Sequence, residues 1–161
     1  MENIVIVDCI RTGLAKSHRG TFNMTRSDDL VAHCIDALLT RNPQLDPAQV
    51  DDVVLGCGRQ IGEQSGNVAR HAVALSQLPI TVPATTISRA CSSGLNSIAI
   101  AATQIASGCA EIMLAGGVES ITGLSRGTPG EFAENPRLMS EKPDMYMAMG
   151  NTAEVVARRY Q

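Results

Sequence analysis

The sequence predicts an α/β protein built on a parallel sheet. Short apolar runs alternate with segments of helical periodicity, in the order strand, helix, strand, helix, strand, helix, strand. Repeated βα units of this kind form parallel sheets with right-handed crossovers. A second observation is the stretch between Arg89 and Glu111, which carries no charged side chain. It has helical spacing but no face suited to bulk water, so we expect a helix between two layers.

Local signals place each element in turn. The apolar run at residues 3–8 alternates too little for an exposed strand and predicts a buried parallel one. Ser27 is expected to cap a helix over residues 28–41, with acidic residues in its first turn and Arg41 at its end. Further strands are expected at 53–56, 83–88 and 112–115, and further helices at 64–76, from 91 to about 106, and at 151–160.

The composition changes at Ser120. Gly, Pro, Arg and Glu dominate residues 123–143, which predicts a loop-like segment before the chain returns to a helix with an Asn151-x-x-Glu154 capping pattern. We therefore expect one domain over residues 1–119 and a second part over residues 120–161.

Charge and composition exclude several function classes. Thirteen Lys and Arg against 16 Asp and Glu leave a net charge of −3, which argues against nucleic-acid or anionic membrane partners. The longest apolar stretch, within residues 98–106, is far shorter than the ~20 residues of a membrane span. The five cysteines form no CxxC or Cys/His cluster, so no metal site is expected. An odd cysteine count without a signal pattern indicates a reducing compartment, and the expected location is the cytoplasm, or an organelle matrix in a eukaryote.

Cys91 is the candidate catalytic residue. It lies where the strand at 83–88 meets the neutral helix, so it is expected on a tight strand-to-helix turn. The first N–H groups of a helix lack intrahelical partners and carry partial positive charge, which favours a thiolate. The same groups, the Cys91 N–H among them, can bind a developing oxyanion. The alternative is a buried structural cysteine, which is how Cys9, Cys34, Cys57 and Cys109 are interpreted.

Three motifs carry a resemblance to a known family. Residues 88–95 (SRACSSGL), 114–120 (LAGGVES) and 149–154 (MGNTAE) agree in order and spacing with the thiolases, the acyl-CoA C-acyltransferases. Residues 19–30 and Ala148, which stands where the biosynthetic branch has a histidine, resemble the degradative branch. Two positions depart from the family pattern: Ser88 replaces an asparagine and Gly13 a proline.

The resemblance implies a layered fold, α-β-α-β-α in the complete enzyme, built from two duplicated halves with a loop domain inserted in the first. Residues 1–119 would be the N-terminal half-domain without its last strand, with an incomplete parallel or mixed sheet. Residues 120–161 would begin the inserted loop domain. The general-base histidine, a second cysteine and most of the acyl-CoA pocket would come from the missing C-terminal half, because His18, His33 and His71 match none of those motifs.

The implied activity is thiolytic cleavage of a 3-oxoacyl-CoA, or the reverse Claisen condensation, through an acyl thioester on Cys91. Met149 would lie near the acyl-pantetheine end of the substrate. Coenzyme A and acyl-CoA would be substrates, and no other cofactor is expected. The complete enzyme would be a homodimer or homotetramer. The acyl-chain length and the physiological direction are left open.

Two alternatives stay open. The chain could be a truncated, catalytically incomplete fragment that acts at most as a CoA-binding or subunit-binding remnant. It could also be a related condensing enzyme of the ketoacyl-synthase type, although the motif at residues 149–154 argues against this. Gly116 and Gly117 follow a strand, but the GxGxxG fingerprint is absent. They are interpreted as positions of close backbone packing.

Overall fold

The computed structural model describes residues 4–124 and 134–160. The chain divides into two compact units, Met1–Thr128 and Pro129–Gln161, each with its own internal packing. The boundary expected at residues 119 and 120 stays a prediction.

A three-stranded parallel sheet lies at the centre of the first unit. Its strands are β1 (Asp52–Gly56), β2 (Ala84–Ile87) and β3 (Met113–Gly117), in the order β2-β1-β3. Val54 of the central strand lies opposite Thr85 in β2 and Ala115 in β3. β1 is buried from its second residue onward, which explains its uninterrupted apolar run. The predicted α/β class and parallel strand direction are confirmed.

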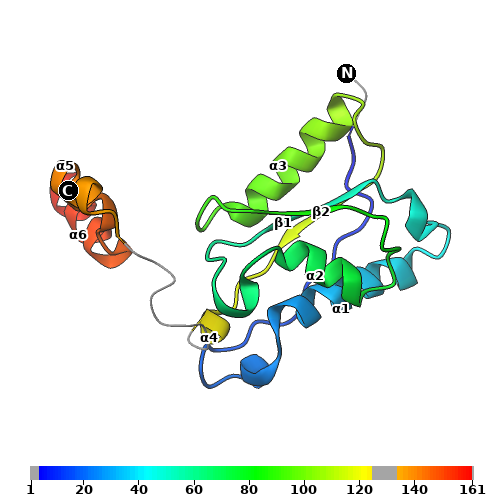
Figure 1. Ribbon diagram of the computed structural model, residues 1–161, viewed down its shortest axis with the longest axis horizontal. Helices are drawn as coiled ribbons and strands as arrows, with labels where there is room; N and C mark the ends of the chain where they lie inside the picture. Colours follow the sequence, from blue (N-terminus) through cyan, green and yellow to red (C-terminus); the bar gives the residue numbers. More distant parts are fainter. Residues whose placement is uncertain (1–3, 125–133, 161) are drawn as a thin grey trace. The chain divides into compact units, whose positions relative to one another are not determined.

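Helices cover both faces of this sheet (Figure 1). Helices α1 (Ser27–Arg41) and α2 (Val68–Leu75) lie on one face, and α3 (Ser93–Ala106) lies on the other. Successive strand side chains point to opposite faces. Val53 and Leu55 accordingly share one buried cluster with α1 and α2. That cluster also contains Val31, Ile35, Leu39, Ala69, Ala72 and Val73.

The N-terminal ends of α1 and α2 differ slightly from the prediction. Ser27 is the first residue of α1 and Arg26 is its N-cap, so Ser27 does not cap the helix. The second helix begins at Val68. Asn67 is its N-cap, and the Asn67 side chain accepts a hydrogen bond from the Arg70 N–H. Residues 62–64 form a short 3₁₀ turn instead of the start of that helix.

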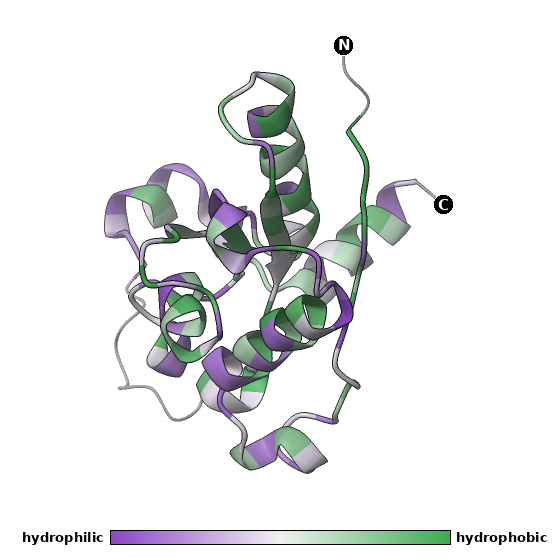
Figure 2. Cartoon of the chain, turned by 90° about the vertical axis from the view of Figure 1, so that its right-hand side faces the viewer, coloured by the Kyte–Doolittle hydropathy of each residue, from purple (hydrophilic) through white to green (hydrophobic). Residues whose placement is uncertain are grey.

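The strand predicted at residues 3–8 is wrong for the described part, residues 4–8. This segment is extended and unpaired, with Val5, Ile6 and Val7 between 70% and 81% exposed. Figure 2 shows it as a hydrophobic stretch close to the N-terminus. A strand needs a neighbour for its backbone hydrogen bonds, and none of the three strands described here pairs with it.

The neutral helix has one of the two layers expected around it in the complete fold. One side of α3 packs on the sheet through Ser93, Ser97 and Ala101, all at most 6% exposed. The other side is open: Leu95 is 73% exposed and Ile98 is 42% exposed. Within the described residues, α3 therefore has a layer on one face only.

Helix α4 (Ile121–Leu124) ends the described part of the first unit, and the second unit contains α5 (Pro136–Glu141) and α6 (Met149–Arg159). The loop predicted at 123–143 is therefore partly helical, while residues 125–133 lie outside the described residues. Helix α6 confirms the helix predicted at 151–160. It begins two residues earlier, after Ala148, so Asn151 lies inside the helix and does not cap it. In the described ranges no helix has the length and apolarity to span a membrane.

Candidate active site

Cys91 is exposed in the short turn between the end of β2 at Ile87 and the start of α3 at Ser93. This is the tight strand-to-helix turn that the sequence predicts. The residue before it, Ala90, has a φ of 48°, in the left-handed region that side chains other than glycine rarely adopt. Such a conformation costs on the order of 1–3 kcal/mol and persists only where the surrounding contacts hold it.

Ser93 supplies several of those contacts. Its hydroxyl accepts a hydrogen bond from the Arg89 N–H at 2.8 Å and donates one to the Ala90 carbonyl at 2.6 Å. The Ser93 N–H also donates to the Ala90 carbonyl, at 3.1 Å. Because Ser93 is only 3% exposed, these bonds are shielded from water. The hydrogen bonds of one buried serine, Ser93, thus hold the turn that carries Cys91 in its conformation.

The first turn of α3 rests directly on the carboxyl ends of β1 and β3. A Cβ atom on Gly56 would overlap the backbone of Ser93, and one on Gly117 would lie 3.2 Å from the Gly94 Cα. One turn further along, the Ser97 hydroxyl donates to the Gly116 carbonyl at 2.6 Å. The close-packing interpretation of Gly116 and Gly117 holds for Gly117, while a Cβ on Gly116 would meet only Leu55, at 3.8 Å.

This arrangement places Cys91 at the N-terminal end of a 14-residue helix. An exposed thiol beside the positive end of a helix dipole has the parts needed for nucleophilic attack.

The other four thiols fall into two groups. Cys57 is 1% exposed, and burial together with the nearby negative charge of Glu119 raises its pKa to about 11. Burial also raises the pKa of the half-buried Cys34. These two fit the packing interpretation. Cys9 and Cys109 are exposed, so the packing interpretation is wrong for them.

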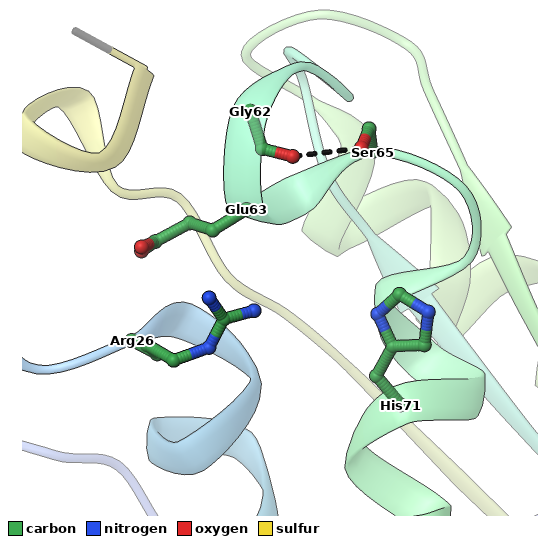
Figure 3. Close-up of a pocket in the computed structure, with 5 residues that line it drawn as sticks. All are labelled: Arg26, Gly62, Glu63, Ser65 and His71. Carbon is green, nitrogen blue, oxygen red and sulfur yellow. Dashed lines mark hydrogen bonds between the residues drawn. The ribbon is translucent and has the colours of Figure 1, made fainter. Parts of the chain in front are cut away.

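His33, His71 and the cavity that His71 lines belong to elements other than the turn that bears Cys91. His33 and His71 are exposed on α1 and α2, as the sequence predicts. His71 lines a cavity of about 570 Å³ together with Arg26, Gly62, Glu63 and Ser65, and the cavity lining does not include Cys91 (Figure 3). Arg26 is already bound to Asp28 by two hydrogen bonds, of 2.9 and 2.8 Å. Across residues 4–124 and 134–160 no three His, Cys, Asp or Glu side chains form a cluster suited to a metal ion.

Met149, the second predicted site residue, is the first residue of α6 in the second unit and is 70% exposed. Its place near a substrate stays a prediction. A group that the sequence interpretation did not single out is Glu119, whose carboxylate accepts a hydrogen bond from the Gly58 N–H at 2.7 Å. The sequence signal that could have singled out Glu119 is its place in the motif at residues 114–120.

Comparison with known proteins decides the family. The sequence matches the N-terminal domain of thiolase over residues 4–161. The chain belongs to the thiolase family. It is 40% identical to a 3-ketoacyl-CoA thiolase of Serratia proteamaculans and 41% identical to one of Erwinia tasmaniensis. A 3-ketoacyl-CoA thiolase of Escherichia coli is also 41% identical.

Each of these three alignments covers 99% of this chain but only 41% of the thiolase relative. The chain therefore spans about two fifths of the length of these proteins. The described geometry at Cys91 belongs to the thiolase N-terminal domain.

Proposed function

We propose that this chain provides the nucleophile of an acyl-CoA C-acyltransferase that cleaves a 3-oxoacyl-CoA with coenzyme A, or runs the reverse condensation. The observation that carries the proposal is the exposed Cys91 thiol on a closed turn at the N-terminal end of α3. The thiolase relationship supports the substrate class, since the similar proteins are named 3-ketoacyl-CoA thiolases.

The proposed reaction has two halves. The Cys91 thiolate attacks the keto carbon of the 3-oxoacyl-CoA, and the bond between the α and β carbons breaks. The electron pair leaves with the acetyl-CoA part, which takes up a proton, and the acyl group stays on sulfur as a thioester. The thiol of a second coenzyme A loses its proton and attacks this thioester, which releases the shortened acyl-CoA and the free thiolate.

A thiol suits both halves because its anion is a strong nucleophile and also a good leaving group. In the first attack, negative charge develops on the keto oxygen, and the Cys91 N–H is the proposed donor to it. Met149 is retained as a proposed contact of the acyl-pantetheine end, and coenzyme A and its acyl ester are the only small molecules that the reaction needs.

The proton transfers require an acid and a base besides the Cys91 thiol. General acid–base groups typically contribute ~10²- to 10⁴-fold each. His33 and His71 lie on α1 and α2 rather than on the turn that bears Cys91. We propose that the C-terminal part present in the longer thiolases supplies these groups, and that the complete enzyme is a homodimer or homotetramer.

A chimeric enzyme tests the function. This chain replaces the matching N-terminal residues of the E. coli 3-ketoacyl-CoA thiolase, and thiolysis is followed by the loss of 3-oxoacyl-CoA absorbance. We expect turnover that Cys91→Ala abolishes, with the acyl group found on Cys91 by mass spectrometry when coenzyme A is withheld. Cys109→Ala is the matched control, because Cys109 is equally an exposed thiol of this chain.

Turnover that survives Cys91→Ala in the chimera would reject Cys91 as the nucleophile. The 161-residue chain by itself is expected to show no turnover. If the isolated chain, verified at 17.0 kDa by intact mass, turned over substrate in a Cys91-dependent way, the proposal that the acid–base groups lie outside it would be wrong.

A further inference from the structure

A buried polar network formed by Gln64 and Glu119 lies near the turn that bears Cys91, and the proposed reaction does not use it. Gln64 is fully buried, yet each polar atom of its side chain is hydrogen-bonded. Its amide N–H₂ donates to the Glu119 carboxylate at 2.9 Å and to the Arg59 carbonyl at 2.8 Å. Its amide oxygen accepts from the Ser120 N–H. A fully satisfied buried amide of this kind holds its partners in one arrangement.

Glu119 extends the network toward the strand end. One of its oxygens is held by Gln64, and the other accepts the Gly58 N–H at 2.7 Å. Hydrogen bonds to an ionised carboxylate are shorter and stronger than those between neutral groups. The Gln64 side chain therefore orients a charged acceptor that fixes the backbone of Gly58.

Gly58 in turn touches the turn that carries Cys91. Its carbonyl accepts a hydrogen bond from the Ser88 hydroxyl at 3.1 Å. A Cβ atom built on Gly58 would lie 3.1 Å from the Ala90 carbonyl and 2.7 Å from Glu119 Oε2. The left-handed Ala90, the residue immediately before Cys91, thus lies close to Gly58 and is hydrogen-bonded to Ser93.

We propose that Glu119 is a positioning residue for Cys91: oriented by Gln64, its carboxylate holds the Gly58 backbone against Ala90 and so maintains the turn that presents the thiol. This inference rests on the proposed role of Cys91 as the nucleophile. Glu119 would affect the position of the Cys91 thiol through Gly58, and it contacts no reacting atom itself.

The test measures the alkylation rate of Cys91 by iodoacetamide in the 161-residue chain, by peptide mapping at several times. Cys109 in the same sample serves as the internal reference, because it is exposed and lies at the far end of α3. We expect Glu119→Ala to lower the ratio of the Cys91 rate to the Cys109 rate by about tenfold, since displacement of a reacting group by ~1 Å costs up to ~10²-fold. Glu111→Ala, the same change just before the other end of β3, is expected to leave the ratio unchanged.

Glu119→Gln tests the route. A glutamine oxygen can still accept the Gly58 N–H, but its N–H₂ would then face the N–H₂ of Gln64, which needs an acceptor there. The ratio of this variant is therefore expected to lie between those of the parent and Glu119→Ala. Ser88 is exposed, and Ser88→Ala removes only the hydrogen bond from its hydroxyl to the Gly58 carbonyl. Because this bond ties Gly58 to the turn, the variant is expected to lower the ratio several-fold. A merely structural role of Glu119 would reduce thermal stability without changing the ratio.

The outcomes separate the two proposals. An unchanged ratio in folded Glu119→Ala overturns the positioning role. If Glu119→Ala does not fold, Ser88→Ala decides, and an unchanged ratio there overturns the role. Parent Cys91 that reacts no faster than Cys109, together with a chimera that retains activity without Cys91, would instead reject the proposed nucleophile.

Discussion

Gly56 at the end of β1 lies directly against the backbone of Ser93, the first residue of α3. A Cβ atom at position 56 would overlap the Ser93 and Gly94 backbones, so the strand end and the helix start touch without any intervening side chain. This contact sets how close the turn that carries Cys91 lies to the carboxyl edge of the sheet.

The first prediction follows from that contact. Gly56→Ala is expected to destabilise the chain by about 2–4 kcal/mol, because backbone atoms on both sides must move to admit the methyl group. Gly94→Ala is the control: no atom lies within 4 Å of its Cβ position, and replacing a helical glycine is expected to add about 0.5–1 kcal/mol. Chemical denaturation measures both, and equal stabilities would contradict the contact.

The second prediction concerns the relative reactivity of the thiols. Cys91 is expected to react fastest with iodoacetamide because it is exposed at a helix N-terminus, whereas Cys57 is expected not to react in the native chain. Cys9 and Cys109, exposed but away from a helix start, should fall between them. Peptide mapping after limited labelling checks the order, and equal labelling of Cys91 and Cys109 would argue against an activated thiol.

A third prediction uses the buried thiol of Cys57, whose pKa burial and Glu119 raise from 9.0 to about 11. Above pH 9 the unfolded thiol ionises while the folded one stays neutral, so the unfolded state binds fewer protons and stability falls as pH rises. The contribution is present below about pH 9 and is lost between pH 9 and 11, amounting to roughly 2–3 kcal/mol. Cys57→Ala should remove this part of the alkaline loss.

The measurement is the free energy of unfolding at pH 8 and at pH 10.5 for both chains. Cys57→Ala itself lowers stability at both pH values because it empties a buried site. The informative quantity is the difference between the two pH values. If that difference is the same in the parent and the variant, the Cys57 thiol is not the group that titrates.

The fourth prediction compares the two sides of α3. Ala101 is 6% exposed and faces the sheet, so Ala101→Asp would bury an unpaired carboxylate and is expected to cost about 3 kcal/mol or more. Ile98 is 42% exposed, and Ile98→Asp is expected to change stability by less than about 1 kcal/mol. Thermal melts of the two variants check the difference, and a larger loss in Ile98→Asp would show that a second layer covers this face in solution.

Much of the first unit was predictable from local pattern. Val53, Val54 and Leu55 form an apolar run that follows two aspartates and ends at Gly56, and the run is the core of the central strand. The amphipathic spacing around Val31, Ile35 and Leu39 likewise predicts α1, whose buried side these residues form. Cys91 could be placed on its turn because a strand signal and a helix signal meet there, and both are set by neighbouring residues.

By itself the sequence determined most of the element types, the parallel α/β class, the thiolase motifs and the candidate nucleophile, because each depends on short-range periodicity or on residue order. Only the tertiary structure decided which apolar surfaces are covered. Val5 to Val7 have strand-like side chains but no strand beside them, and Leu95 and Ile98 belong to an apolar helix with a layer on one face only. The contact of Gly56 with Ser93 and the path from Gln64 through Glu119 to Gly58 were equally hidden, because they join residues far apart in the chain, and such contacts exist only once the backbone is folded.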